Sequence, residues 1–280
     1  MILIADSGST KCHWAICGSG SSPVHLATDG LNPFACSDEK ISATLDQQVM
    51  PHVAAHEIEA VYFYGAGCIF EGAERIGRAL QERFPQARTE VESDMLGAAR
   101  ALCGHSGGIA CILGTGSNSC LYDGERITAN VPPLGYVLGD EGSGAHIGRL
   151  VVADILKGLM SEQLREALYR ECATSYAEII DRVYRQPQAN RYLAGFAEFA
   201  ARHIDDAAVA ACVDRAFDAF IERNVMQYAT EGRTVGFVGS TAYFFRERLL
   251  LSLERHSLLP GRIMRSPIDA LIAYHGHNIM

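Results

Sequence analysis

The chain opens with a run of apolar residues, which is followed by a polar bend and then by an alternating run. Residues 1–5 are Met-Ile-Leu-Ile-Ala, residues 6–10 are Asp-Ser-Gly-Ser-Thr, and residues 11–17 alternate between apolar and polar positions. Such alternation on both sides of a bend rich in glycine and hydroxyl residues predicts two strands joined by a turn. A third strand is expected at about residues 24–28, so the chain begins as the antiparallel meander of an α/β domain.

The same pattern returns in the middle of the chain. Residues 109–113 are apolar, residues 114–117 read Gly-Thr-Gly-Ser, and residues 117–122 return to an extended pattern. Asp123-Gly124 then favours a two-residue hairpin into a strand at about residues 125–130. Because the polar, glycine-rich break at 104–108 precedes this second copy, we expect an N-terminal domain at 1–107 and a C-terminal domain at 108–280.

Helical patterns occupy much of the remaining chain. Ser37 fits the N-cap of a helix that extends to roughly residue 52. A strand at 60–64 leads into Gly65-Ala-Gly67, which either lets a substrate approach or simply turns the chain into the next helix. Residues 161–231 are amphipathic, with 209–231 long enough for about six helical turns, and we find no chemistry in them. The predicted fold class is α/β, with a helical insertion in the second domain.

The glycines at positions 114 and 116 are the first candidates for chemistry. They permit positive φ and carry no side chain that would keep an anion from the backbone. Successive N–H groups of such a turn can form a concave anion site, to which Thr115, Ser117 and Asn118 add donors. Gly-Thr-Gly turns also occur in β proteins without a ligand. The second copy of the pattern at residues 6–10 favours a duplicated phosphate site.

Composition and charge restrict the function classes. The chain has 280 residues, of which 48% are hydrophobic and 20% charged, as is typical of a globular protein with a substantial core. Its formal net charge of −9 argues against a nucleic-acid partner. No apolar run approaches the roughly 20 residues that span a bilayer. The chain begins with a predicted strand and an acidic turn instead of the basic and then apolar stretch of a signal peptide, so we expect a cytoplasmic protein without a membrane partner.

The nine cysteines predict neither a disulfide framework nor a zinc site. Their number is odd, and no Cys-x-x-Cys spacing occurs. Cys17, Cys111, Cys120 and Cys212 fall within apolar strand or helix patterns. We therefore expect buried, reduced thiols.

Three motifs resemble, in order, the two phosphate motifs and the adenosine motif of the actin, hexokinase and Hsp70 superfamily. They are Asp-x-Gly-x-Thr at 6–10, Gly-Thr-Gly-Ser at 114–117 and a strand–Gly–Ser–helix element at 236–241. Within that superfamily the chain is most similar to the N-acetylglucosamine kinases of the BadF/BadG/BcrA/BcrD ATPase family. There Gly-Thr-Gly-Ser-Asn precedes a glycine–aromatic pair and then Gly-Asp-Glu-Gly-Ser, as at 135–136 and 139–143 here. The likeness extends from Met1 to about Phe245.

The resemblance implies two ribonuclease H-like domains of duplicated topology, an actin-like ATPase fold, with the ligand cleft between them. It also implies ATP and Mg²⁺ as cofactors, an amino sugar such as N-acetylglucosamine or glucosamine as substrate, and a homodimer as one arrangement. Residues matching the family's ATP and phosphate contacts are Gly8, Ser9, Thr10, Lys11, Gly114, Thr115, Gly116, Gly239 and Ser240. Residues matching its sugar contacts are Asn32, Asp94, Ser117, Asn118, Gly135, Tyr136 and Asp140.

Asp94 is the residue to which the resemblance assigns the role of general base. It follows an extended segment and opens a helical one, in which Gly97-Ala98-Ala99 match the small residues of the family. Phosphoryl transfer to a sugar needs a carboxylate within hydrogen-bond reach of the attacking hydroxyl. The alternative is that Ser93 or Asp94 merely caps the helix.

Asp6 and Glu141 are the candidate metal ligands. Mg²⁺ keeps much of its hydration shell and uses one or two carboxylates besides nucleotide oxygens, so Asp6 is expected to act through water. Glu141 is the weaker candidate, for sugar or metal, because the adjacent pair Asp140 and Glu141 also complements a helix dipole. The role of Asn32 is open as well: it either contacts the sugar or only forms a turn, since Asn-Pro is a common turn pair.

The alternative function is an ATP-hydrolysing switch that drives a partner protein. Dehydratase activators of the same broad family carry an iron–sulfur cluster on cysteines, and no matching pair of loop cysteines occurs here. A sugar sensor without catalysis would have no need of both Asp6 and Asp94. Leu134 stands where a second glycine is expected, which leaves recognition of an acetyl group open. His275 and His277 have metal-ligand spacing but no carboxylate partners, so we expect them in solvent.

Overall fold

A five-stranded mixed sheet organises the first part of the chain in the computed structural model, which describes residues 1–18 and 20–276. The chain divides into two units. Unit 1 comprises residues 1–106, 124–126 and the segment from Ser266 onward, and unit 2 comprises 107–123 and 127–265. The boundary predicted at 107/108 assigned the last segment to the second domain. In the structure that segment packs on unit 1 through its helix, which contacts the first two strands.

The sheet of unit 1 begins with the expected meander. Its strands are β1 (Ile2–Ser7), β2 (Lys11–Cys17), β3 (Val24–Asp29), β4 (Ala60–Gly65) and β5 (Arg88–Ser93). Their order is β3-β2-β1-β4-β5, with β1, β2 and β3 antiparallel and with β4 and β5 parallel to β1. In register, Asp6 lies opposite Tyr64, and Gly65 opposite Ser93. The carboxyl ends of three parallel strands therefore lie at one edge.

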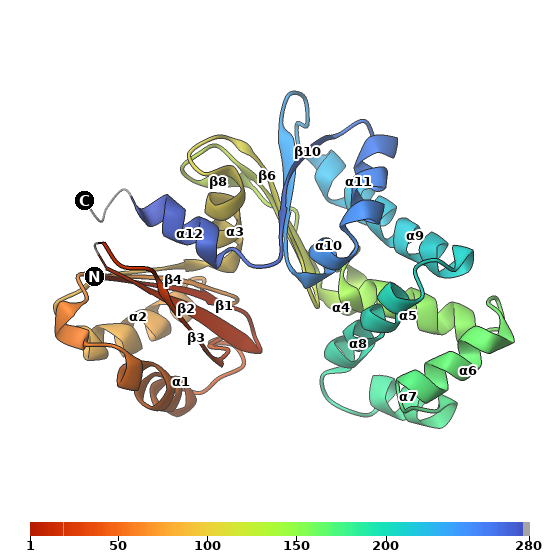
Figure 1. Cartoon of the computed structure of the whole chain (residues 1–280), viewed down its shortest axis with the longest axis horizontal. Coiled ribbons are helices and arrows are strands. Elements are labelled where there is room, and N and C mark those ends of the chain that lie inside the picture. The colour runs from red at the N-terminus through yellow and green to blue at the C-terminus, as the bar shows by residue number, and fades with distance from the viewer. Residues whose placement is uncertain (19, 277–280) are drawn as a thin grey trace. The chain divides into compact units, whose positions relative to one another are not determined.

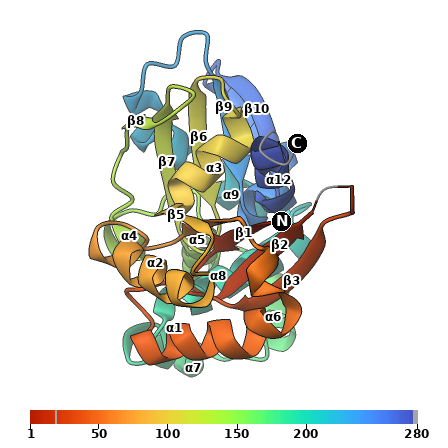
Figure 2. The same ribbon diagram turned by 90° about the vertical axis from the view of Figure 1, so that its left-hand side faces the viewer.

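Helices cover both faces of this sheet. They are α1 (Asp38–Thr44), α2 (Glu71–Arg83), α3 (Asp94–Cys103) and α12 (Ile268–His275). α1 and α2 lie on one side, and α3 and α12 on the other (Figure 1 and Figure 2). Alternate strand residues face each layer: Leu3, Trp14 and Phe63 belong to the core that includes α1 and α2. Tyr62 and Tyr64 face α3 and α12 instead.

The helix predicted for 37–52 is shorter than expected. Ser37 caps it as predicted, its Oγ accepting a hydrogen bond from the Lys40 backbone N–H at 3.3 Å. Regular α-helix ends at Thr44, and wider and tighter turns follow at Leu45–Val49, Met50–His52 and Ala55–Glu57. This irregular backbone buries Leu45 and Val49 completely. Tertiary packing thus overrides the simple helical period.

The expectation of solvent-exposed histidines near the end is wrong for His275. Its side chain is 3% exposed, and its Nε2 lies 2.8 Å from the Tyr64 hydroxyl. The reason is that α12 closes one face of unit 1 and carries this residue against β4. His277 lies outside the described residues.

Unit 2 repeats the topology of unit 1. Its strands are β6 (Gly108–Leu113), β7 (Ser117–Tyr122), β8 (Ile127–Ala129), β9 (Thr234–Val238) and β10 (Leu259–Met264). Their order is β10-β9-β6-β7-β8. From β8 to β10 the pairings are antiparallel, antiparallel, parallel and parallel, as they are from β3 to β5 in the first sheet. The chain therefore has the predicted α/β fold, two ribonuclease H-like units of duplicated topology.

Helices connect the strands of unit 2, and several of them pack on other helices of the unit. They are α4 (Gly135–Leu138), α5 (Gly144–Leu156), α6 (Glu162–Glu171), α7 (Tyr176–Tyr184), α8 (Ala189–Arg202), α9 (Ala207–Arg223), α10 (Ser240–Phe244) and α11 (Arg246–Arg255). Figure 1 shows α5, α8, α9 and α11 on the same side of β10. Ile109, Leu113 and Phe237 join residues of these helices in one buried core.

The single helix predicted for 209–231 ends early. α9 stops at Arg223, and a short 3₁₀ turn covers Val225–Gln227. Leaving the helix axis buries Val225 and directs the Tyr228 hydroxyl toward β7, where it lies 2.9 Å from the Ser119 Oγ and donates to the Ser119 carbonyl at 3.0 Å. A longer helix would forgo these contacts.

The nine cysteines are free thiols in the structure. Cys17, Cys111, Cys120 and Cys212 are buried, as their apolar surroundings in the sequence predicted. Within residues 1–18 and 20–276, no helix combines the length and apolarity that a membrane span requires.

Candidate active site

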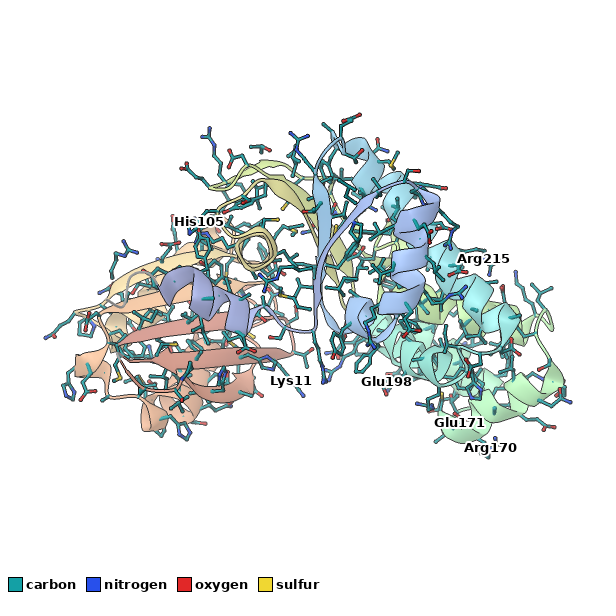
Figure 3. All side chains as sticks on the ribbon, turned by 45° about the horizontal axis from the view of Figure 1, so that its top comes forward. Lys11, His105, Arg170, Glu171, Glu198 and Arg215 are labelled. Atoms are coloured by element: carbon teal, nitrogen blue, oxygen red, sulfur yellow. The ribbon has the colours of Figure 1, made fainter. Side chains whose placement is uncertain are left out.

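The turn between β1 and β2 exposes two consecutive backbone donors. The Gly8 N–H donates to the Lys11 carbonyl at 3.0 Å and closes the turn. The N–H groups of Ser9 and Thr10 have no acceptor within the described part of the chain. Lys11, labelled in Figure 3, is exposed at the start of β2. Two free N–H groups beside a cation are suited to phosphate oxygens.

Asn32 lies directly against this turn. Its Nδ2 donates to the Ser9 Oγ at 2.8 Å, and its Oδ1 accepts from the Phe34 N–H at 2.9 Å. The glycine loop after β4 also reaches Asn32, because a side chain at Gly67 would clash with the Asn32 Oδ1. Gly67 has a φ of 79°, which other residues rarely adopt. The structure thus brings together two regions that the sequence could not connect.

Asp94 opens α3 without capping it. The Ser93 Oγ fills the capping role by accepting from the Leu96 N–H at 3.2 Å. The capping alternative therefore applies to Ser93 and leaves the Asp94 carboxylate available. Burial raises the pKa of Asp94 to about 6, although backbone N–H groups of the helix start oppose the shift.

Asp6 shares this environment. Burial, and secondly the charge of Asp94, raise the pKa of Asp6 to about 7. No hydrogen bond to the Asp6 side chain occurs within the described residues. The parallel register places the end of β1 and the start of α3 at one sheet edge, so the two carboxylates interact electrostatically.

Small residues allow α3 to approach the sheet closely. A side chain at Gly97 would lie 2.8 Å from the Tyr64 ring. Ala98 and Ala99 are fully buried next to it. Close packing fixes the helix whose first residue is Asp94.

The turn between β6 and β7 repeats the arrangement of free donors. The Gly114 N–H donates to the Gly116 carbonyl at 2.9 Å, and the N–H groups of Thr115 and Gly116 have no acceptor within the described residues. Two hydrogen bonds to the Gly114 carbonyl hold the turn in place. The Gly114 carbonyl accepts from the Gly144 N–H at 2.8 Å and from the Thr241 Oγ1 at 3.0 Å. Both predicted phosphate turns therefore present an N–H pair.

Asp140 is aimed at the second turn. Its Oδ1 accepts from the Ser117 N–H at 3.2 Å, and its side chain lies so near Gly116 that an added Cβ would be 3.0 Å from the Oδ2. Asp140 is 8% exposed, and burial raises its pKa. Its φ of 52° is unusual for a residue with a side chain. Strain of this kind needs support from the surrounding fold.

Three other predicted residues have partners of their own. The Asn118 Oδ1 accepts from the Ser119 N–H and the Asn130 amide, at 2.9 and 3.0 Å. Glu141 forms an ion pair with Arg223 of α9, so its carboxylate is partly neutralised. The Tyr136 carbonyl lies 3.5 Å from an Arg149 guanidinium nitrogen.

Leu134 and Gly135 enter α4 with left-handed backbones. Their φ angles are 62° and 73°. The first value explains why a glycine would be expected at 134, since a leucine there is strained. The leucine side chain is 59% exposed.

A cavity of about 580 Å³ lies entirely within unit 2 and joins the second turn to the adenosine motif. Gly114, Thr115, Ser240 and Thr241 line one part of it. A side chain at Gly239, where φ is 126°, would clash with the Leu113 carbonyl, so glycine permits the close approach of the two turns.

The rest of the lining of this cavity was not predicted from the sequence. It is formed by one face of α8, from the region where no chemistry was expected, and by aromatic and cationic residues near α10: Arg191, Ala194, Gly195, Glu198, Arg202, Phe244, Phe245 and Arg265. Glu198 is labelled on α8 in Figure 3. The Arg265 guanidinium lies 5.3 Å from the Phe244 ring centroid. The small pair Ala194-Gly195 between charged residues at helical spacing is the one sequence signal that this face carried.

The residues around Asp6 fit a magnesium ion. Among the described residues, no group of three or more histidine, cysteine or carboxylate side chains could hold a metal alone. Asp6 and Asp94 are instead two interacting carboxylates without a cationic side-chain partner in the described residues. Such a pair suits a cation that takes its remaining ligands from water and a nucleotide.

The duplicated topology and the paired N–H turns define the class as the actin-like ATPase superfamily. No protein-family model matches the chain, and no curated protein matches it significantly. The structure of a proposed N-acetylglucosamine kinase from Porphyromonas gingivalis matches with a TM-score of 0.96 and 49% identity over 100% of both chains. The chain belongs to the same family of sugar kinases.

Two more distant structures share the fold. A proposed N-acetylglucosamine kinase from Chromobacterium violaceum has a TM-score of 0.64 at 21% identity, over 98% of both chains. A ROK-family glucokinase from Streptomyces griseus, in complex with glucose and AMPPNP, has a TM-score of 0.56 at 13% identity, over 99% of this chain and 98% of that chain.

Proposed function

We propose that the protein transfers the γ-phosphoryl group of ATP to a hydroxyl of an amino sugar, N-acetylglucosamine or glucosamine. The observation that carries this proposal is the half-buried Asp94, which does not cap its helix and has a raised pKa of about 6. The similarity to the P. gingivalis protein, named as a proposed N-acetylglucosamine kinase, supports the choice of sugar.

In the proposed reaction, Asp94 takes the proton of the attacking sugar hydroxyl. The new bond forms between that oxygen and the γ-phosphorus, while the bond from the γ-phosphorus to the bridging oxygen breaks and ADP leaves. A base with a pKa of about 6 is still ionised at neutral pH and accepts a proton more readily than an ordinary aspartate. Asn32, beside the first turn, and Asp140, beside the second, are the proposed contacts for sugar hydroxyls.

The two turns are the proposed phosphate sites. Free N–H groups at Ser9 and Thr10, and at Thr115 and Gly116, can donate to phosphoryl oxygens as charge develops on them. The cavity in unit 2 is the proposed site for adenosine. Magnesium held through water by Asp6 would neutralise phosphate charge.

The test is ADP release from Mg·ATP, measured without sugar and with N-acetylglucosamine, glucosamine, N-acetylmannosamine or glucose. We expect one amino sugar to stimulate release manyfold and to yield a matching amount of sugar phosphate. Release that no sugar changes would contradict the proposal and would favour an ATPase that acts on a partner protein.

Asp94→Asn tests the base. We expect kcat to fall by about 10²- to 10⁴-fold, with little change in ATP affinity, because the proposed adenosine cavity is in unit 2. Glu92→Gln, a half-buried carboxylate on the preceding strand, is the matched control and should stay active. An Asp94→Asn enzyme with the activity of the control would refute the assignment.

A further inference from the structure

A second cavity lies within unit 1, at the opposite end of β5 from Asp94. Its volume is about 260 Å³. Strands β4 and β5 contribute Tyr62, Arg88 and Glu90, and α3 contributes Arg100. The remaining lining residues are His105, Tyr274 and His275. The reaction proposed above uses none of these side chains.

Two stacked pairs of rings line this cavity. The His275 ring lies 3.7 Å from the Tyr62 ring at an interplanar angle of 20°. The His105 ring lies 4.5 Å from the Tyr274 ring at 27°. His105 is labelled in Figure 3, just after α3. Stacking holds these flat surfaces in place.

The two arginines offer donors that the protein itself does not use. Arg100 donates through Nη1 to the Tyr64 hydroxyl and to the Glu90 carboxylate, both at 2.6 Å, but its buried Nε has no hydrogen-bond partner in the described chain. Arg88 donates through Nη2 to the Tyr62 hydroxyl at 2.8 Å, and its side chain is 69% exposed. A buried donor without an acceptor is costly, and the exposed guanidinium of Arg88 is the part of this pair that a ligand reaches directly.

The charge of the lining favours an anion. Two guanidinium groups face one carboxylate, and Glu90 is closer to Arg100 than to Arg88, at 2.6 against 3.9 Å. His275 adds no charge at neutral pH, because burial, and secondly Arg100, lower its pKa to about 4. The Arg88 charge therefore remains largely uncompensated.

We propose that this cavity binds a small oxyanion, the carboxylate of an organic acid or the phosphate of a monoester. The planar forks of Arg88 and Arg100 match the oxygens of either group. The stacked rings give the rest of such a ligand flat surfaces to contact. The ligand would touch α3, whose other end carries Asp94.

Histidine NMR resonances provide a local readout of this site. Inorganic phosphate and, separately, succinate are titrated into the full-length protein at pH 7.5, with sodium chloride at matched ionic strength as the reference. His105 and His275 resonances are assigned from His105→Gln and His275→Gln variants. We expect at least one of the two anions to shift both resonances saturably. Phosphate bound at the nucleotide turns would leave them unmoved.

Arg88→Ala is the decisive variant, because this exposed edge-strand residue is not needed for the core. We expect the apparent dissociation constant to rise at least tenfold. Arg78→Ala is the control, since it removes an exposed arginine from α2, on the other face of the sheet. Saturation by phosphate alone would identify a phosphate site, and by succinate alone a carboxylate site. No saturable shift with either anion, or Arg88→Ala binding like Arg78→Ala, would overturn the proposal.

Discussion

Asp6 should make the folded protein less stable as the pH rises. Burial and the charge of Asp94 raise its pKa from 3.8 to about 7, so the folded chain binds the Asp6 proton more tightly than the unfolded chain. Stability that depends on this proton is present below about pH 4 and is lost progressively as the pH rises through 7. Replacing Asp6 with the uncharged asparagine removes this loss.

The size of the effect follows from the shift. Each pKa unit corresponds to about 1.4 kcal/mol, so a pKa that moves from 3.8 to about 7 sets an upper bound of about 4 kcal/mol. Asp6 is only half-buried, and solvent reduces the effect. We therefore expect the difference in unfolding free energy between Asp6→Asn and the wild type to grow by about 2 to 4 kcal/mol between pH 4 and pH 8.

Urea unfolding followed by tryptophan fluorescence measures this difference in unit 1, which contains Asp6. Trp14 is the single tryptophan of the chain, is fully buried in unit 1 and donates from Nε1 to the Thr28 Oγ1 at 3.0 Å. Glu74→Gln, at an exposed carboxylate on α2, is the control and should show no widening gap. If the gap between Asp6→Asn and the wild type stays constant from pH 4 to pH 8, the reasoning is refuted. The variant should also lose kinase activity, since Asp6 is the proposed metal ligand.

Three further substitutions test the supports of the site. Gly67→Ala would place a Cβ against the Asn32 Oδ1 at a φ of 79°, so we expect the free energy of unfolding to fall by about 1 to 3 kcal/mol. The KM for the sugar should rise while the KM for ATP stays unchanged, and equal changes in both KM values would contradict this expectation. Thr241→Val removes the hydrogen bond to the Gly114 carbonyl, so the KM for ATP should rise while that for the sugar stays constant in initial-rate assays. Tyr64→Phe removes a hydroxyl that bonds buried His275 and partly buried Arg100, so we expect the free energy of unfolding in urea to fall by about 1 to 3 kcal/mol. Unchanged stability would show that these bonds contribute nothing.

Local chemistry made the two turns predictable from sequence. Alternating strands flank them, and hydroxyl residues surround the free N–H groups. The positive φ expected at Gly114 and Gly116 does not occur, so these glycines and Gly8 contribute by carrying no side chain beside the N–H groups. Caps are equally local, and Ser37 occupies the predicted position at the start of α1. These features depend on residues within a few positions of one another, which a single sequence displays directly.

Features that depend on packing were not predictable in this way. The electrostatic coupling of Asp6 to Asp94 arises from the register of β1, β4 and β5, which no local pattern encodes. α8 was read as an ordinary amphipathic helix, because only its position beside the second turn makes one face a cavity wall. His275 was misjudged for a related reason: its burial comes from the return of the last helix to unit 1.

That return has a consequence for synthesis on the ribosome. The chain leaves unit 1 at residue 106, and α12, which completes one face of that unit, follows all of unit 2 in the sequence. Every residue of unit 2 has left the peptidyl-transferase centre before α12 is made, so the unit that starts first finishes last. A premature stop before Ser266 would therefore damage the unit that carries Asp94, although the stop lies far from it in sequence, and would leave the sequence of unit 2 whole.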